Sequence, residues 1–150
     1  MVTWLFLAAI NLANLQLPVM NGAANEVFEP KDERVFVIEA YFNTCPYCNE
    51  NAPNVDRLAA DYDGDARVKV LDVGIDRSIT EYESWIRKHN PNHPVLKDDK
   101  RKLISQLGTT SYPSTYVLDA DGNVKFRSVG SWNSSTEQKI RKAIDDILVD

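Results

Sequence analysis

Two cysteines, separated by a proline and a tyrosine, are the residues of this 150-residue sequence whose types and spacing could do redox chemistry. The motif follows the apolar run 35–42, and it opens a segment with the pattern of a helix. Pro46 suits the first helical position, because its missing N–H would have had no partner there. Cys45 would then cap the helix and face free N–H groups at the positive end of the helix dipole. That setting favours a thiolate, which is the attacking species in disulfide exchange.

The spacing of the two cysteines also allows them to bond. Side chains three residues apart are neighbours on a helix, with Cβ atoms about 5–6 Å apart, so a modest rotamer change closes a disulfide. The alternatives are a structural staple, or half of a metal site completed by His89 and His93. A staple across so short a loop stabilises little, and the gap from Cys48 to His89 far exceeds the about 12–15 residues of a zinc finger. We therefore predict an accessible redox pair, no metal, and two histidines at the surface.

Glu39 is the one charged residue in the apolar run 35–42, and it precedes Cys45 by six positions. A buried carboxylate is costly when it is ionised and usually holds its proton. Since perturbed titratable groups gather at functional sites, we predict that Glu39 exchanges a proton with Cys48. The alternative is a structural carboxylate that pairs with a lysine or reaches water at the end of the sheet.

The elements that must position these residues follow from hydrophobic periodicity. The run 35–42 is apolar on both faces of a strand, which predicts a central strand covered on both sides. Further strands are expected at 68–73, 95–96, 116–118 and 124–129, and helices at 46–62, 78–89, 98–107 and 134–147. Ahead of them, the segments 15–19 and 27–28, joined by an Asn-Gly turn, predict a short hairpin.

Length and composition bound the possible functions. The chain suits one domain at residues 15–150, preceded by an apolar leading segment at residues 1–14. That segment is too short for a membrane span of about 20 residues, so it is either a signal or anchor remnant or an ordered extension. The net charge is −5 without a basic stripe, which argues against nucleic acid as a partner.

The order of these motifs, with Pro113 standing before a strand, resembles the thioredoxin superfamily. The similarity is greatest to the TlpA/ResA-like branch, which are thiol–disulfide oxidoreductases of the bacterial extracytoplasmic space. It covers residues 15–147 and implies a three-layer α/β/α sandwich with a mixed central sheet, to which the hairpin is an N-terminal extension. A departure is Thr44, which stands where the family commonly has a tryptophan.

The resemblance also implies roles for individual residues. Cys45 matches the family's nucleophile and Cys48 its resolving cysteine, while Pro113 matches a cis-proline beside the disulfide. Glu39 falls at the position of the family's buried acid. The remaining matches imply contacts with substrate and involve Pro46, Tyr47 and Tyr112.

We therefore expect a monomeric thiol–disulfide oxidoreductase that acts on protein disulfides, as a reductase, with an upstream electron donor. The redox-active cysteine pair would be its chemistry, without a dissociable cofactor. The alternatives are an oxidase or isomerase, or a thioredoxin-fold binding module without turnover. The expected location is periplasmic or otherwise extracytoplasmic, with the cytoplasm as the alternative. Membrane association is expected only if the leading segment is an anchor.

Overall fold

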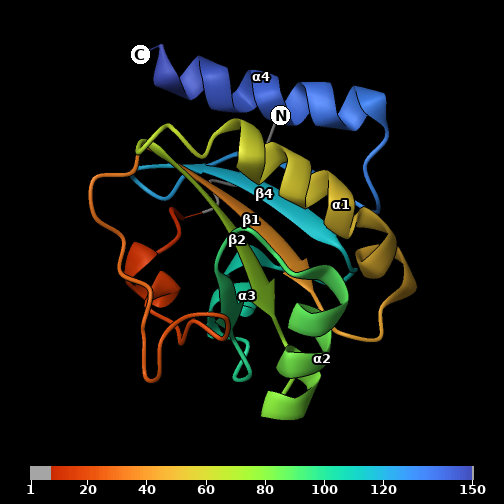
Figure 1. Ribbon diagram of the computed structural model, residues 1–150. Coiled ribbons are helices and arrows are strands. Elements are labelled where there is room, and N and C mark those ends of the chain that lie inside the picture. Colours follow the sequence, from red (N-terminus) through yellow and green to blue (C-terminus); the bar gives the residue numbers. More distant parts are fainter. Residues whose placement is uncertain (1–7, 150) are drawn as a thin grey trace, which may run out of the picture.

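The computed structural model describes residues 8–149, which fold around one mixed β-sheet (Figure 1). A short 3₁₀ helix precedes the sheet, and strands and helices then alternate for most of the chain. In order, the elements are η1 (Leu12–Leu15), β1 (Val35–Tyr41), α1 (Pro46–Asp61), β2 (Val68–Gly74), α2 (Ile79–His89), β3 (Val95–Lys97), α3 (Lys102–Leu107), β4 (Ser114–Asp119), β5 (Val124–Val129) and α4 (Ser134–Leu148).

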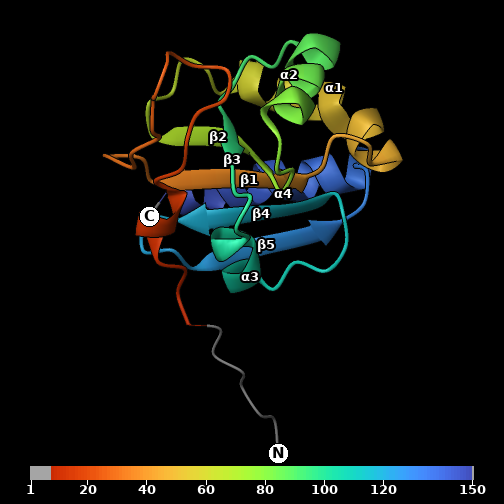
Figure 2. The ribbon, with the colours of Figure 1, turned by 90° about the horizontal axis from the view of Figure 1, so that it is seen from below.

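The sheet has the strand order β3-β2-β1-β4-β5, and Figure 2 shows β2, β1, β4 and β5 side by side. The strand β1 pairs in parallel with β2 and antiparallel with β4, while β5 forms the far antiparallel edge. All seven residues of β1 are buried, which confirms the prediction of a central strand covered on both faces. Burial alternates along β5, as expected for an edge strand with one wet face.

Different elements pack on the two faces of the sheet. Side chains of Val35 and Val37 pack under α1 and α4, whereas those of Phe36 and Ile38 pack under α3 and the N-terminal segment. Figure 1 shows α1 and α4 on one side of the sheet and α3 on the other. This arrangement confirms an α/β thioredoxin-like fold with a five-stranded mixed sheet between helices.

Local sequence signals set most helix starts. Ser78 and Glu81 form the predicted capping box at the start of α2. At α4 the cap is Asn133, one residue earlier than the Ser-Ser-Thr-Glu pattern indicated. The helix α3 begins at Lys102 rather than at residue 98, because the carboxylate of Asp98 accepts hydrogen bonds from the N–H groups of Lys102 and Ile104.

The predicted N-terminal hairpin is wrong. Instead of two strands, this stretch makes isolated bridges between Pro18 and Val27 and between Val19 and Leu96. The reason is competition from the sheet edge: the N–H of Met20 donates to Val95, and a carbonyl of Pro18 accepts from Lys97. Proline has no N–H to give to a hairpin ladder.

Residues 1–7 of the leading segment lie outside the described residues, so its role as a signal or anchor stays a prediction. The part that follows is packed on the domain: Ile10 is buried, and its N–H donates to the carbonyl of Gly122 at 2.8 Å. Between residues 8 and 149, none of the helices has the length and apolarity that crossing a membrane requires.

Candidate active site

The two cysteines lie at the start of α1, after the loop that follows β1. They are joined by a disulfide with Cα atoms 5.2 Å apart. Cys45 is the N-cap of α1 and Pro46 its first residue, as predicted. The sulfur of Cys45 accepts a hydrogen bond from the backbone N–H of Cys48 at 3.2 Å. In the reduced protein the same N–H, together with the helix dipole, would stabilise a thiolate at Cys45.

The expectation that the cysteine pair is accessible is wrong for this structure. Cys45 and Cys48 each expose only 2% of their surface. The reason is an aromatic cluster beside them, in which the half-buried rings of Phe42 and Tyr112 form part of the outer rim. Tyr47, between the cysteines, is 63% exposed, so the buried cysteine pair is next to an exposed residue of the same loop.

The loop before Cys45 is held by polar contacts from three directions. The N–H of Asn43 donates to Asp76 at 2.8 Å, and its carbonyl accepts from Lys88 at 3.0 Å. The amide of Asn49 donates to the carbonyls of both Asn43 and Cys45. Burial raises the pKa of Asp76 to about 6, with the neighbouring carboxyl Glu81 adding to the shift. These contacts fix the position of Cys45 at the helix start.

The loop before β4 brings Tyr112 and Pro113 to the cysteines. The peptide bond between them is cis, and the sulfur of Cys45 lies 3.7 Å from the carbonyl oxygen of Tyr112. The ring of Tyr112 meets that of Phe42 edge to face, with centroids 5.6 Å apart. A pocket of about 390 Å³ opens beside these two rings, and its other lining residues are Ile75, Asp76, Arg77, Glu81 and Arg101.

Glu39 lies in the buried layer under α1, where it is 4% exposed. Its carboxylate accepts hydrogen bonds from the side chains of Asn51 and Thr115, both at 2.5 Å. Asn51 follows Cys48 by three residues on the same helix, so Glu39 sits one helical turn below the second cysteine. The indole of Trp132 donates to the hydroxyl of Thr115 at 2.8 Å, which completes the network.

The environment of Glu39 favours its neutral form. Burial raises its pKa from 4.5 to about 8, against the lowering effect of the hydrogen bonds from Thr115 and Asn51. The carboxylate of Asp72, opposite Glu39 on the neighbouring strand, adds to the increase, whereas His93 opposes it. The group is therefore able to gain or lose a proton close to neutral pH.

The prediction that both histidines are surface residues is wrong for His93, whose side chain is 4% exposed. Its loop folds inward between α1 and β2, where Asp72 and Asp56 offer carboxylates to it. His89 is half-buried: it packs on Trp85 and contacts the amide oxygen of Asn49 at 2.8 Å. Within the described part of the chain, no group of three or more His, Cys, Asp or Glu side chains could hold a metal ion.

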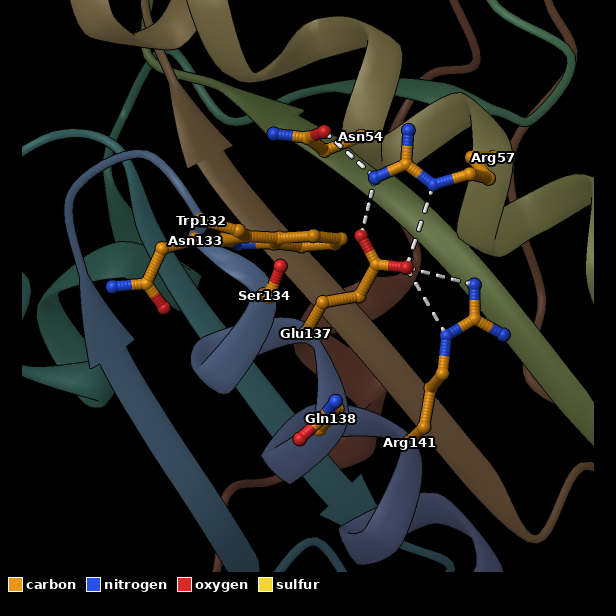
Figure 3. Close-up of a pocket in the computed structure, with 8 residues that line it drawn as sticks. All are labelled: Asn54, Arg57, Trp132, Asn133, Ser134, Glu137, Gln138 and Arg141. Carbon is orange, nitrogen blue, oxygen red and sulfur yellow. Dashed lines mark hydrogen bonds and ion pairs between the residues drawn. The ribbon is translucent and has the colours of Figure 1, made fainter.

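A second pocket, of about 370 Å³, lies over α1 and α4 (Figure 3). Arg57 and Arg141 approach the carboxylate of Glu137 from two sides, and Arg141 also pairs with Asp61, so two carboxylates balance the two positive charges. The ring of Trp132 forms one wall. The indole N–H of Trp132 donates to Thr115, and the lining residue Asn54 donates to the amide oxygen of Asn51, so this pocket adjoins the Glu39 network at two points.

The structure thus brings together Cys45, Cys48, Tyr112 and Pro113, and places Glu39 beneath them. Pro46 and Tyr47 are exposed on the same loop. The sequence analysis missed four polar partners of Glu39 and its neighbourhood: Asn51, Asp72, His93 and Thr115. Helical spacing from Cys48 could have found Asn51, but the other three have no local signal.

Comparisons with known proteins agree with this geometry. Residues 12–127 match the AhpC/TSA family. The chain is 24% identical to the thiol:disulfide interchange protein DsbE of Haemophilus influenzae over 125 residues, which cover 83% of this chain and 65% of that protein. It is 21% identical to the thiol-disulfide oxidoreductase ResA of Bacillus thuringiensis over 117 residues, or 78% of this chain and 66% of that protein. The chain thus spans about two thirds of the length of these two relatives.

The fold has close counterparts among solved structures. One is a secreted disulfide oxidoreductase of Mycobacterium tuberculosis, homologous to the DsbE of E. coli, with a TM-score of 0.68 at 18% identity. The superposition covers 89% of this chain and 98% of that one. Together with the sequence matches, it confirms the predicted resemblance to thioredoxin-like proteins of the ResA type.

Proposed function

This chain belongs to the AhpC/TSA family, and on that premise we propose that it is a thiol–disulfide oxidoreductase acting on protein disulfides. The observation that carries the proposal is the disulfide between Cys45 and Cys48 at the N-terminus of α1, beside the loop of Tyr112 and Pro113. The relatives named DsbE and ResA carry the same activity in their names. The redox-active pair supplies the chemistry, and we propose that no dissociable cofactor takes part.

The proposed reaction begins with the reduced pair. The thiolate of Cys45 attacks a sulfur of the partner disulfide, and one partner sulfur leaves as a thiolate. The proton of Cys48 then moves to Glu39, and the thiolate of Cys48 attacks Cys45. The mixed disulfide breaks, the second partner sulfur leaves, and the Cys45–Cys48 disulfide remains. An upstream electron donor must then reduce the pair again.

Glu39 is proposed as the proton acceptor for the second attack. Its position one turn below Cys48, with Asn51 between them, supports that role. A pKa of about 8 supports it further, because the carboxyl can both take and release a proton near neutral pH. Exchange with Cys48 would run directly or through a water molecule.

Substrate contact is proposed at the rim of the aromatic cluster. Tyr112 would offer backbone groups to an extended partner segment by strand addition, and Pro113 would hold that backbone beside the disulfide. Pro46 and Tyr47, exposed next to the cysteines, would meet the other side of the partner. The pocket beside Phe42 and Tyr112 offers room for a partner side chain.

We propose the reductase direction by analogy with the TlpA/ResA-like branch. The direction depends on the redox potential, for which 30 mV corresponds to about 1.4 kcal/mol. Oxidase or isomerase activity is the alternative within this chemistry. The low exposure of both sulfurs favours a second alternative, a binding module without turnover.

The remaining proposals concern the setting of the protein. We propose a monomeric domain at residues 15–150 and an extracytoplasmic location, supported by the secreted protein of similar fold. A cytoplasmic location is the alternative. Residues 1–14 would be a signal or anchor remnant, or an extension of the fold, and only an anchor would bring the protein to a membrane.

Equilibration in glutathione buffers, with a readout of the Cys45–Cys48 state, tests the proposal. A reductase is expected to hold its disulfide until the buffer is strongly reducing, whereas an oxidase loses it in mildly reducing buffer. Cys48→Ser should trap mixed disulfides that a non-reducing gel displays, and Cys45→Ser should trap none. The serine at position 45 keeps a good helix cap, so it serves as a folded control.

Alkylation of the reduced protein distinguishes turnover from the binding module. A catalytic Cys45 should react with iodoacetamide faster than a free cysteine at pH 6, because the helix N-terminus stabilises its thiolate. Slow alkylation, together with no reduction of a model protein disulfide, would refute the oxidoreductase and leave the binding module.

A further inference from the structure

His93 is a buried histidine on the loop between α2 and β3, and the proposed reaction has so far given it no role. Its Nε2 lies 3.0 Å from a carboxylate oxygen of Asp72 on β2. Its Nδ1 lies 3.3 Å from a carboxylate oxygen of Asp56 on α1. The side chain of Asp56 is 30% exposed, whereas those of His93 and Asp72 are 4% and 5% exposed. The imidazole is thus enclosed by acceptors from two elements.

Asn92 places a proton on Nδ1 of this ring. Its amide N–H donates to the backbone carbonyl of Asp56 at 2.9 Å, which fixes the orientation of the amide. The amide oxygen therefore faces Nδ1 of His93, at 2.8 Å. Nε2 lies 3.0 Å from Asp72 but makes no aligned hydrogen bond, so the contact there is electrostatic. The two carboxylates of Asp56 and Asp72 favour the charged form of His93.

The charge of His93 affects the pKa of Glu39. Asp72 is the direct neighbour of Glu39 in the parallel register of β1 and β2, so their side chains lie on the same face of the sheet. The carboxylate of Asp72 opposes the ionisation of Glu39 beside it. His93 lowers the pKa of Glu39, and Glu39 in turn raises the pKa of His93.

The site of His93 also borders a route to solvent. A cavity of about 100 Å³ between α1 and β2 has His93 in its lining. The charged residues that line the same cavity are Asp63, Asp65 and Lys69. Together with Asp56, Asp72 and Glu39, they are the charged groups that the neighbouring elements place around the imidazole.

We propose that His93 is a positioning residue for disulfide exchange: its buried positive charge balances Asp72 and allows Glu39 to ionise and accept the proton of Cys48. This role rests on the proposed function and names the group that controls its second step. Without the imidazolium, Glu39 stays protonated beside Asp72, and a protonated carboxyl cannot accept the proton of Cys48.

His93 controls the step in which the mixed disulfide is resolved. The S–H bond of Cys48 breaks, and its proton passes to the carboxylate of Glu39. The sulfur of Cys48 bonds to that of Cys45, while the bond from Cys45 to the partner breaks and the electron pair leaves with the partner sulfur. The cysteine pair loses two electrons and the partner gains them. His93 keeps its proton throughout.

NMR titration of the full chain with isotope-labelled histidine tests the electrostatic part. At pH 7 the His93 ring should carry protons on both nitrogens, and a neutral ring would overturn the proposal. Glu39→Gln removes the facing carboxylate, so the pKa of His93 should fall. Because coupling between two sites is reciprocal, an unchanged pKa of His93 would show that Glu39 does not feel it either.

Stopped-flow measurement of the resolution of a mixed disulfide, as a function of pH, tests the catalytic part. His93→Gln should shift the midpoint of this profile upward by about 1 pH unit and slow resolution about tenfold at pH 7, because a nearby charge shifts a pKa by about 1–3 units. Adding Asp72→Asn should restore the midpoint, since it removes the opposing carboxylate. A merely structural role would not predict this rescue.

Lys142→Gln is the matched control, because it removes one positive charge from an exposed position on α4 and should leave the profile unchanged. If His93→Gln resolves mixed disulfides with the wild-type profile, the role of His93 is refuted while the proposed function stands. If the wild-type protein forms no mixed disulfide at all, the proposed function fails, and the role of His93 in exchange fails with it. The NMR titration identifies which of the two has failed, because it needs no turnover.

Discussion

The two faces of the central sheet are equally well buried but differ in chemistry. Under α3 and the N-terminal segment, β1 presents Phe36, Ile38 and Ala40 to a core of apolar side chains. Under α1 and α4, the same strand presents Val35 and Val37, and then Glu39. The change from valine to glutamate occurs within one strand, toward the end at which the cysteines lie.

This difference shows that one face of the sheet is apolar along its whole length, whereas part of the other face holds buried titratable groups. Burying apolar area stabilises by about 25 cal/mol per Å² whichever side chain supplies it. A buried carboxylate, in contrast, costs free energy and is retained only where hydrogen bonds and charges compensate it. Glu39, Asp72 and His93 form such a compensated group.

The largest expected effect is on the pH dependence of stability. The pKa of Glu39 is raised from 4.5 to about 8, so its contribution to stability is complete below pH 4.5 and is lost as the pH rises to about 8. Each pH unit in that window should cost about 1.4 kcal/mol, on the order of 5 kcal/mol in total. Glu39→Gln should remove this slope. Denaturant unfolding of both proteins between pH 4 and pH 9 measures it, and parallel curves would contradict the buried neutral carboxyl.

Next in size is the loss of apolar contacts on the opposite face. Ile38→Ala should lower the free energy of unfolding by about 2–5 kcal/mol, because a fully buried side chain leaves a cavity. The rate of disulfide exchange per folded molecule should stay at the wild-type value. Urea unfolding and turnover at a temperature where the variant is folded check both statements. A selective loss of exchange rate would show that the two faces are not separate.

Glu39→Gln should also slow the resolution of mixed disulfides, by about 100-fold at pH 9, since general bases contribute about 10²–10⁴-fold. The first attack by Cys45 should be unaffected, because its thiolate is stabilised by the helix N-terminus. Single-turnover kinetics separate the two steps. Equal rates of resolution in both proteins would remove Glu39 from the mechanism.

The smallest expected effect comes from a buried carboxylate with a purely structural task. Asp98 is 2% exposed and caps the start of α3 at the apolar face. Asp98→Ala should cost about 1 kcal/mol of stability through the lost cap, without a shift in the pH profile of exchange. Thermal unfolding and the resolution assay check this. A shifted profile would mean that any buried carboxylate, and not only Glu39 near Cys48, affects the pH dependence of exchange.

Much of the fold was predictable from local patterns. Hydrophobic runs gave the five strands to within a few residues, and the Cys45 cap and the Ser78–Glu81 capping box gave two helix starts. The prediction of an N-terminal hairpin was wrong, because this segment forms hydrogen bonds with β3 at the edge of the sheet. The prediction that the cysteines are exposed was wrong for a similar reason, since Phe42 and Tyr112, from loops far apart in the sequence, pack in one cluster with them.

By itself the sequence determined the chemistry at the helix start, because a cysteine cap, a proline at the first position and a second cysteine one turn later are all local. It also placed a carboxyl in the central strand. The tertiary structure alone decided what surrounds that carboxyl. Thr115 reaches Glu39 across 76 residues of chain, and His93 reaches Asp72 from a separate loop. Such partners depend on strand register and loop packing, which cannot be predicted from the residue pattern within one element.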